Sequence, residues 1–338
     1  MHLFRPALSL LACTLAFDAA AVSCGDVVTS DVTLTADLHC SSGYVALDVV
    51  APGVTIDLNG HTLSGDIGLV GIALNEAHGT VIKGPGVIKG FWAGVNGVRS
   101  DGVQVHGVEF AALDVGISLN NSDGISVEAN KFHGLQGHAV TLSHLPFAPG
   151  GRSGGHRIVD NFVAGAGMGF QLCGAATGWS KIEGNVLEDI ADYGIHFEDG
   201  SAGNVVANNR MTKVGNTGLV IRGSDGTRVL GNVMTGGRIG ITLVPEHWGL
   251  CGTGGAVPEV RKTVIEGNTI LEHESAVVAG LGMTTAPQVY KNRINGNKFY
   301  YDGTGVLFLD DTYGNDATGN AYAGTTDPVI DFGTGNAW

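Results

Sequence analysis

Short segments in which apolar and polar residues alternate recur along most of the chain. The segments 194–198 (GIHFE), 218–222 (GLVIR) and 240–244 (GITLV) each place two apolar residues, two positions apart, behind a glycine. Alternation with a period of two is typical of a β-strand that buries one face. We therefore expect many short strands whose apolar sides share one core.

A longer period orders these segments. An x-I-x-G-N-x-I pattern recurs along the chain. The position of its asparagine is occupied by His61, Gly86, Val108, Asn130, Asn161, Asn185, Asn209, Asn232, Asn268, Asn297 and Asn320. Seven of the ten gaps between these positions are 22 to 25 residues long, and eight of the eleven positions are Asn. Repeats of this length are typical of leucine-rich repeats or of a β-helix. The chain lacks the L-x-x-L-x-L pattern of the former, so we favour the latter.

Each period has room for three short strands joined by Gly and Asn bends. Such a unit forms one coil, and stacked coils pair their strands in parallel about 4.8 Å apart. Asn tolerates left-handed backbone and hydrogen-bonds locally, so equivalent Asn side chains at one corner can join coil to coil. We therefore interpret the Asn row as scaffold.

These repeats, together with the opening CGDVVTSDVTLTADLHC and GVTIDLNGHTLSG, resemble the right-handed parallel β-helix proteins of the pectin-lyase-like superfamily over roughly residues 24–335. The resemblance implies an all-β fold, a single right-handed parallel β-helix (solenoid) of about eleven coils. That group includes polysaccharide lyases, polygalacturonase-like hydrolases, uronan epimerases and proteins without demonstrated activity. The fold alone does not choose among these functions.

Composition and charge narrow the class of protein. Glycine contributes 55 of the 338 residues, which suits tight turns between short strands, and 43% of residues are apolar, which is too many for a disordered chain. A formal net charge of -14 argues against nucleic acid as a partner.

The first 21 residues are predicted to be a signal peptide. Arg5 precedes an apolar stretch at 7–17, and alanines at 19–21 offer a cleavage site. No later stretch reaches the length of about 18 apolar residues that spans a membrane. We expect a monomeric domain over residues 22–338, secreted or periplasmic, with lipidation at Cys24 as the alternative to a free, soluble form.

Four cysteines follow the predicted signal peptide: Cys24, Cys40, Cys173 and Cys251. An even number in an exported chain suggests disulfides. Cys24 and Cys40 flank one short segment, so we pair them, which leaves Cys173 for Cys251; the alternative is four reduced thiols. The chain has no C-x-x-C pair, so we expect no thiolate metal site.

Three gaps in the repeat are long, namely 130–161, 232–268 and 268–297. In all three the extra residues follow the alternating strand, so the insertions should leave one corner and rim one face. Insertions on one face of a solenoid usually mark its binding side. The first two carry polar and aromatic candidates for a substrate site: His144, Arg152, His156, Glu246, His247 and Trp248.

The outward residues of the same strands form two predicted rows. One row runs Thr141, Gln171, His196, Val220, Thr242, and the other runs Ser143, Cys173, Glu198, Arg222, Val244. Gln171, His196, Glu198 and Arg222 should then form one patch. Residues 129–159 contain no acid and residues 200–245 contain only Asp225, so the surroundings are locally basic and suit an anionic glycan. Chance clustering of solvated charges is the alternative.

The patch suits β-elimination or epimerisation of a uronate-containing glycan, which both begin with loss of the proton next to the carboxylate. We assign Arg222, helped by Gln171, to the developing negative charge, and His196 to the base. His247, Tyr193 or Glu246 would supply the acid, and Glu198 would orient His196 or hold a cation. Substrate contacts are assigned to Gln171, Tyr193, Arg152, His144, Glu246 and Trp248. We favour a lyase.

Two alternative functions stay open. Hydrolysis needs two carboxylates, and Glu198 with Glu246 or Asp199 is the available choice. Glu198 and Arg222 could instead form a surface ion pair in a protein that only binds glycans, with exposed tryptophans stacking on sugar rings. No cofactor is required by the sequence, although Asp310, Asp311 and Asp316 are candidate ligands for Ca²⁺.

Overall fold

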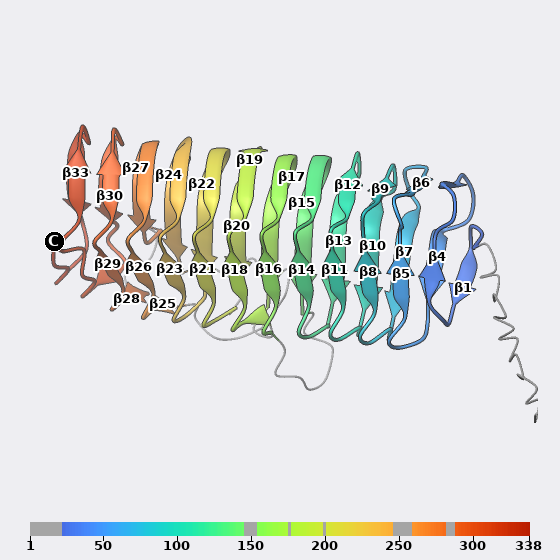
Figure 1. The fold of residues 1–338 in the computed structure, drawn as a ribbon. Coiled ribbons are helices and arrows are strands. Elements are labelled where there is room, and N and C mark those ends of the chain that lie inside the picture. Colours follow the sequence, from blue (N-terminus) through green and yellow to red (C-terminus); the bar gives the residue numbers. More distant parts are fainter. Residues whose placement is uncertain (1–21, 145–153, 175–176, 199–200, 246–258, 282–287) are drawn as a thin grey trace, which may run out of the picture.

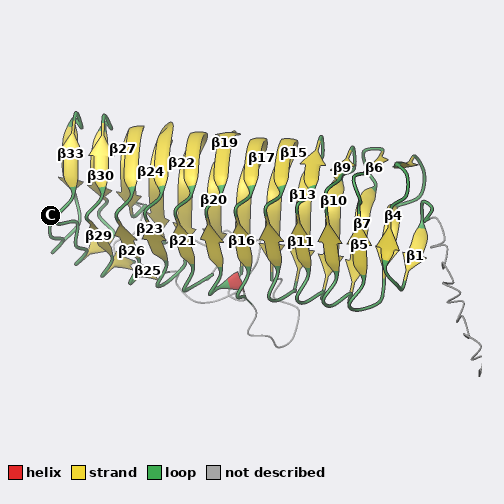
Figure 2. Cartoon of the chain, viewed as in Figure 1, coloured by secondary structure: helices red, strands yellow, loops and turns green. Residues whose placement is uncertain are grey.

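The computed structural model describes residues 22–144, 154–174, 177–198, 201–245, 259–281 and 288–338. Strands from successive coils lie side by side in chain order from one end of the molecule to the other (Figure 1). The pairings between them are parallel, and strands and turns make up nearly all of the described chain (Figure 2). The predicted all-β solenoid is confirmed.

Each coil contributes strands to three faces, which we name face 1, face 2 and face 3. Face 1 contains β1 (Asp26–Val28), β4 (Val45–Val49), β7 (Val70–Asn75), β10 (Ala93–Val98), β13 (Val115–Asn120), β20 (Tyr193–Glu198), β31 (Thr304–Phe308) and β34 (Asp327–Asp331). Face 3 contains β3 (Leu38–Cys40), β6 (Thr62–Gly65), β9 (Val87–Lys89), β12 (Glu109–Ala111), β19 (Val186–Ile190), β30 (Lys298–Tyr300) and β33 (Ala321–Ala323). Five long strands bend from face 3 into face 1, namely β15 (Lys131–Ser143), β17 (Phe162–Cys173), β22 (Arg210–Arg222), β24 (Val233–Val244) and β27 (Thr269–Ala279).

Face 2 is a separate sheet of eleven strands, in agreement with about eleven coils. It contains β2 (Val32–Thr33), β5 (Thr55–Asp57), β8 (Val81–Lys83), β11 (Gln104–His106), β14 (Ser126–Glu128), β16 (Arg157–Val159), β18 (Lys181–Glu183), β21 (Val205–Ala207), β23 (Arg228–Leu230), β26 (Val264–Glu266) and β29 (Arg293–Asn295). A small sheet of β25 (Val260–Arg261), β28 (Val289–Tyr290) and β32 (Thr312–Tyr313) lies near the C-terminal end.

The core fills the centre of the coils with stacked side chains. The middle residue of successive face 2 strands is buried in coil after coil, as Ile158, Ile182 and Val206 illustrate. Phe110 and Phe132 stack with their ring centroids 4.9 Å apart. The alternation seen in the sequence therefore places one apolar side chain above the next along the whole solenoid.

The Asn row forms a continuous ladder at the corner between face 2 and face 3. From Asn130 to Asn297, each backbone N–H donates to the side-chain oxygen of the Asn in the next coil, at 2.8–3.0 Å. Each side-chain amide also donates to a backbone carbonyl, as Asn185 does to Ile158 at 2.8 Å. The interpretation of this row as scaffold is confirmed, because these buried groups satisfy one another.

A glycine opens most alternating segments, and Ala46, Ala139 and Ala276 hold the same place in three other coils. A Cβ on Gly169 would lie 2.2 Å from the carbonyl oxygen of Gly194, and one on Gly194 would lie 2.5 Å from that of Gly218. A side chain at either of these two positions would force the neighbouring coils apart. The repeated glycine therefore fixes the corner from which face 1 starts.

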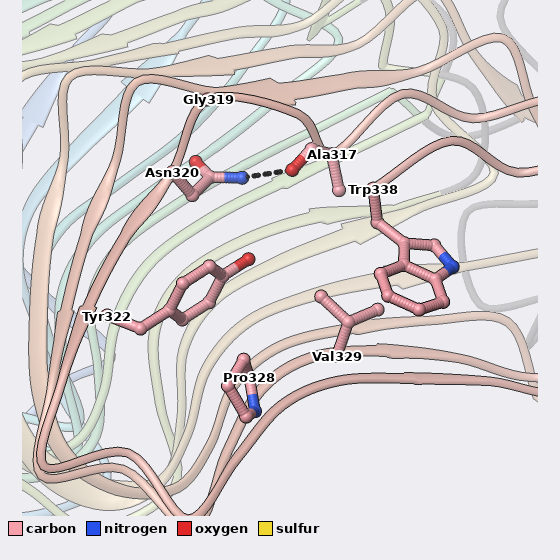
Figure 3. A pocket seen from close by; sticks show the side chains of 7 residues that line it. All are labelled: Ala317, Gly319, Asn320, Tyr322, Pro328, Val329 and Trp338. Atoms are coloured by element: carbon pink, nitrogen blue, oxygen red, sulfur yellow. Dashed lines mark hydrogen bonds between the residues drawn. The ribbon is translucent and has the colours of Figure 1, made fainter.

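The two ends of the solenoid differ. The first coil is closed by the predicted Cys24–Cys40 disulfide. At the other end, a pocket of about 340 Å³ opens beside Tyr322, Val329 and Trp338 (Figure 3). Pro328 lies in the last face 1 strand, β34, where it lacks an N–H to offer and so protects the exposed edge from pairing. None of the described residues forms a helix able to span a membrane.

Candidate functional site

Face 1 carries both of the predicted outward rows. Register pairs Gln171 with His196 and His196 with Val220, and the second row pairs Cys173 with Glu198. The strands β17, β20 and β22 that hold them are neighbours (Figure 1). Ile195 and Phe197, which alternate with His196 and Glu198, belong to the hydrophobic core. His196 and Glu198 therefore point away from the core, as the sequence predicted.

Glu198 is the centre of this patch. Its Oε2 accepts a hydrogen bond from Nε2 of Gln171 at 3.2 Å, and its Oε1 lies 3.5 Å from Nη1 of Arg222. The residue is only 1% exposed. A buried carboxylate is stable only when it is paired and hydrogen-bonded, and here the two adjacent coils supply those contacts.

The ion pair between Glu198 and Arg222 is buried, which excludes the surface ion pair considered as an alternative. Arg222 is only 5% exposed. Removal of two charges from water is costly, and a protein recovers that cost only through close pairing. Glu198 therefore holds the guanidinium of Arg222 in a fixed, buried position on face 1.

His196 is an uncharged base in this setting. It is 4% exposed, and its pKa is lowered to about 3, mainly because burial disfavours the charged ring and also because Arg222 and His138 are near. Its Nε2 lies 4.0 Å from Oε2 of Glu198, too far for a hydrogen bond, and neither ring nitrogen has a hydrogen-bond partner. The ring is therefore neutral at neutral pH, and the low pKa makes it a weak base in the free protein.

Tyr193 lies on the same strand and contacts His196. Their ring centroids are 5.0 Å apart, with the planes tilted by 53°. Burial raises the pKa of the Tyr193 phenol, and the charge of Asp192 acts in the same direction. Tyr193 therefore keeps its proton at neutral pH and can act as a proton donor.

His138 is a site residue that the sequence interpretation missed. It lies on β15 and pairs with Met168, two residues before the pair that joins Phe170 to Ile195. Its charge affects His196, and burial lowers its own pKa against the opposing influence of Asp114 and Asp192. The register of β15 shifts between Leu135 and His138, so strict alternation did not identify this residue as outward-facing.

Several predicted site residues lie beyond the ends of the face 1 strands. His144 follows β15, and its backbone N–H donates to the carbonyl of Cys173 at 2.9 Å, so it lies at the edge of the patch. Cys173 is disulfide-bonded and its Sγ lies 3.7 Å from Oε2 of Glu198. The other predicted members lie outside the described residues: Arg152, Glu246, His247, Trp248, Asp199 and the expected disulfide partner Cys251.

The placement of His156 in the substrate loop was wrong. It is buried at the corner between face 1 and face 2, where its Nδ1 accepts the backbone N–H of Ile125 at 3.2 Å. Its own N–H donates to Ser180 Oγ, and the N–H of Ser180 donates to Asn204 Oδ1. His156 therefore takes the place of a Ser or Asn in a second ladder, and the 24-residue spacing to Ser180 was the signal for it.

The basic zone is weaker than its sequence suggested, because several of its cations are paired. Arg157 contacts Glu128 at 3.0 Å, and Arg238 contacts Glu274 at 3.6 Å. These pairs involve exposed side chains. Arg222 is paired as well, with Glu198, and is the cation that lies within the patch itself.

The proposed calcium ligands already have protein partners. Asp311 is buried and accepts the backbone N–H of Leu281 at 3.0 Å, and Asp316 accepts the hydroxyl of Thr318 at 2.7 Å. Within the described part of the chain, no group of three or more His, Cys, Asp or Glu side chains could hold a metal ion. Calcium binding stays a prediction.

Two family profiles each match about half of the chain. The family described as "Right handed beta helix region" matches residues 169–327, and the one described as "Periplasmic copper-binding protein (NosD)" matches residues 53–210. No curated protein matches the chain significantly.

Solved structures give the same fold at low sequence identity. The A-module of the mannuronan C-5 epimerase AlgE6 from Azotobacter vinelandii is 13% identical, with a TM-score of 0.54, 89% of this chain and 91% of that chain covered. The catalytic unit of a GH87 α-1,3-glucanase from Streptomyces thermodiastaticus is 15% identical, with a TM-score of 0.58. The match covers 92% of this chain and 61% of the glucanase chain. PfbA, a surface adhesin of Streptococcus pneumoniae, is 11% identical, with a TM-score of 0.54. The match covers 88% of this chain and 81% of the adhesin chain. The coils, the ladders and these matches together identify the chain as a right-handed parallel β-helix protein.

Proposed function

We propose that this protein acts on an acidic polysaccharide and removes the proton beside the carboxylate of a uronate unit. One observation carries the proposal: the neutral, buried His196 lies between Tyr193 and the Glu198–Arg222 ion pair on the outer side of face 1. The similar structures named for action on mannuronan and α-1,3-glucan support a carbohydrate substrate.

Arg222 would bind the uronate carboxylate. A guanidinium carries five N–H donors, enough for Glu198 and a second carboxylate together. Negative charge grows on the substrate carboxylate as the neighbouring proton leaves, and a fixed cation stabilises that charge without reorganisation. Gln171 and Glu198 hold Arg222 in position through their shared contact.

His196 would accept the proton. A pKa of about 3 keeps the ring neutral in the free protein. The arriving carboxylate adds a negative charge, which raises the pKa of His196 and makes it a stronger base when substrate is bound. Formation of the complex thus prepares the base for the reaction.

Elimination is the outcome that the described residues favour. In elimination the proton passes to His196, the bond from the adjacent carbon to the leaving sugar oxygen breaks, and that oxygen takes a proton. Tyr193 is protonated and its ring contacts that of His196, so a proton donor lies beside the base. Epimerisation instead requires a proton donor on the opposite side of the sugar ring.

Non-catalytic glycan binding is the second candidate. The specific observation in its favour is the near-complete burial of His196, Glu198 and Arg222, which is typical of residues that stabilise a structure. Hydrolysis has less support, because Glu198 is engaged by Gln171 and Arg222 and is a poor donor of a proton to a leaving group.

An exported location fits this function. The Cys24–Cys40 disulfide is typical of oxidising compartments, so a secreted or periplasmic protein is proposed. The copper binding named in the description of the NosD family is not assigned to this chain, since the described residues offer no cluster of metal ligands.

The test is incubation of purified protein with a panel of uronate polymers in deuterated water. Proton exchange next to the carboxylate, followed by NMR, reports the first step of both lyase and epimerase reactions. Ultraviolet absorbance of an unsaturated product identifies elimination. His196→Ala and Arg222→Ala should abolish both signals. His133→Ala is the matched control, because His133 is exposed and contacts Glu109 on face 3.

Each result selects one function. Deuterium incorporation without unsaturation would show an epimerase, and shorter chains without either signal would show a hydrolase. Binding of a polymer with no chemical change would establish the non-catalytic candidate. Signals that persist in His196→Ala would overturn the assignment of the base.

A further inference from the structure

In successive coils, one residue with left-handed (positive-φ) backbone lies at the corner between face 1 and face 2. Its backbone N–H donates to a carbonyl of the next coil. Glycine holds this place in most coils, at Gly53, Gly79, Gly102, Gly124, Gly155, Gly203 and Gly226, with φ between 61° and 72°. Other residues hold it in three coils: Trp179, in the coil that contains β17 and β18, with φ 57°, and Lys262 and Lys291 with φ 57° and 54°. A bulky side chain is strained in this conformation.

The indole of Trp179 is also open to solvent. The residue is 78% exposed, so burial in the core does not explain its presence. A Cβ on Gly203 would lie 2.8 Å from the ring of Trp179. The absence of a side chain at Gly203 therefore lets the indole lie against the backbone of the next coil, with one face toward solvent.

This ring lies on the same coils as the candidate site. Trp179 follows Cys173 by six residues, and Gly203 follows Glu198 by five residues in the coil against which the indole rests. Five extended residues span at most about 18 Å, and a turned corner spans less. The ring is thus within reach of an oligosaccharide whose uronate unit contacts Arg222.

We propose that Trp179 is a stacking platform for a sugar ring of the bound polysaccharide, at a subsite beyond the Glu198 end of the patch. This inference rests on the proposed function for its substrate. The C–H groups on one face of a pyranose ring match the electron-rich face of an indole, and a rigid aromatic side chain loses little conformational freedom when it binds. Ligand contact would then explain the exposure of the indole on the coils that carry the patch.

The test compares binding of uronate oligosaccharides to Trp179→Gly and Trp179→Phe, both in the His196→Ala background so that the ligand is not consumed. Glycine fits the left-handed corner, so Trp179→Gly removes the ring without adding strain. Calorimetric titration should show about a tenfold rise in Kd for Trp179→Gly and a small rise for Trp179→Phe. Trp92→Ala is the control, because Trp92 is 40% exposed at the opposite corner of face 1.

The outcomes separate this inference from the proposed function. Unchanged affinity in Trp179→Gly would overturn the platform even if proton exchange is observed with the wild type. A tenfold loss in a protein without catalysis would support the platform and reject proton abstraction. A melting temperature several degrees lower in Trp179→Gly would show that the ring is a structural cap and would overturn the proposal, as would failure of every oligosaccharide to bind.

Discussion

Glu198 Oε1 lies 3.5 Å from Arg222 Nη1, and the two side chains are 1% and 7% exposed. Arg238 and Glu274 form a second pair at 3.6 Å, but these side chains are 62% and 76% exposed. The distance is almost the same in the two pairs and the burial is opposite. A comparison of the two pairs therefore measures the effect of burial on an Arg–Glu pair within one protein.

Replacement of Glu198 by Ala should lower the free energy of unfolding by about 3–5 kcal/mol, because it removes the buried carboxylate that lies 3.5 Å from the guanidinium of Arg222. Glu274→Ala should lower it by less than about 1 kcal/mol, because water and salt screen the exposed pair. Urea unfolding followed by circular dichroism measures both. Equal losses in the two variants would contradict the burial of the Glu198 site.

A second prediction concerns the stability of the protein in mild acid. Burial lowers the pKa of His156 to about 4, from an ordinary value of 6.5. Between these two values the unfolded chain takes up a proton that the folded chain does not, so stability falls as the pH drops from 6.5 to 4. This single group should cost about 3 kcal/mol over that range.

His156→Ser isolates this contribution. Ser180 and Asn204 hold the same ladder place in the next two coils, so a serine preserves an acceptor for the N–H of Ile125. Unfolding free energies at pH 7 and pH 4 should differ less in the variant than in the wild type, by about 3 kcal/mol. The prediction fails if the two proteins lose the same stability, and His133→Ala should behave as the wild type.

The repeat made the outer rows of face 1 predictable. Strand alternation defined which residues face outward, and the constant period fixed which residue of the next coil lies beside each one. Gln171, His196 and Val220 therefore lie in register as expected. The first disulfide was also predictable, because Cys24 and Cys40 bracket a single short segment.

Features that depend on departures from the repeat were not predictable. The register shift before His138 breaks the alternation, so nothing in the local pattern placed this histidine near His196. Burial of Glu198 depends on how neighbouring coils and corners pack around it, which periodicity does not describe. His156 was assigned to an insertion because its ladder equivalents are Ser and Asn, residues of different size and chemistry.

The Asn ladder gives a third prediction, on stability alone. Asn209 is buried, its side-chain oxygen accepts the N–H of Asn185, and its amide donates to the carbonyl of Ile182. Asn209→Ala leaves both backbone groups buried without partners and should cost about 2–5 kcal/mol. Asn208→Gly is the adjacent control, since Asn208 is exposed with φ 56°, and it should cost little. A loss below about 1 kcal/mol for Asn209→Ala would show that water replaces the ladder contacts.

The pH dependence of activity tests the assignment of His196 as the base. A base works in its neutral form, and burial holds the pKa of His196 in the free protein at about 3. The profile of kcat/KM reports the free protein, so it should show no acid limb from His196 near pH 6.5. The profile of kcat reports the complex, in which the substrate carboxylate raises the pKa of His196, so its acid limb should lie at a higher pH than that of kcat/KM.

Both profiles should be measured only where circular dichroism shows the protein folded. An acid limb near pH 6.5 in kcat/KM would indicate a solvent-exposed base, and its loss in His133→Ala would identify that residue in place of His196.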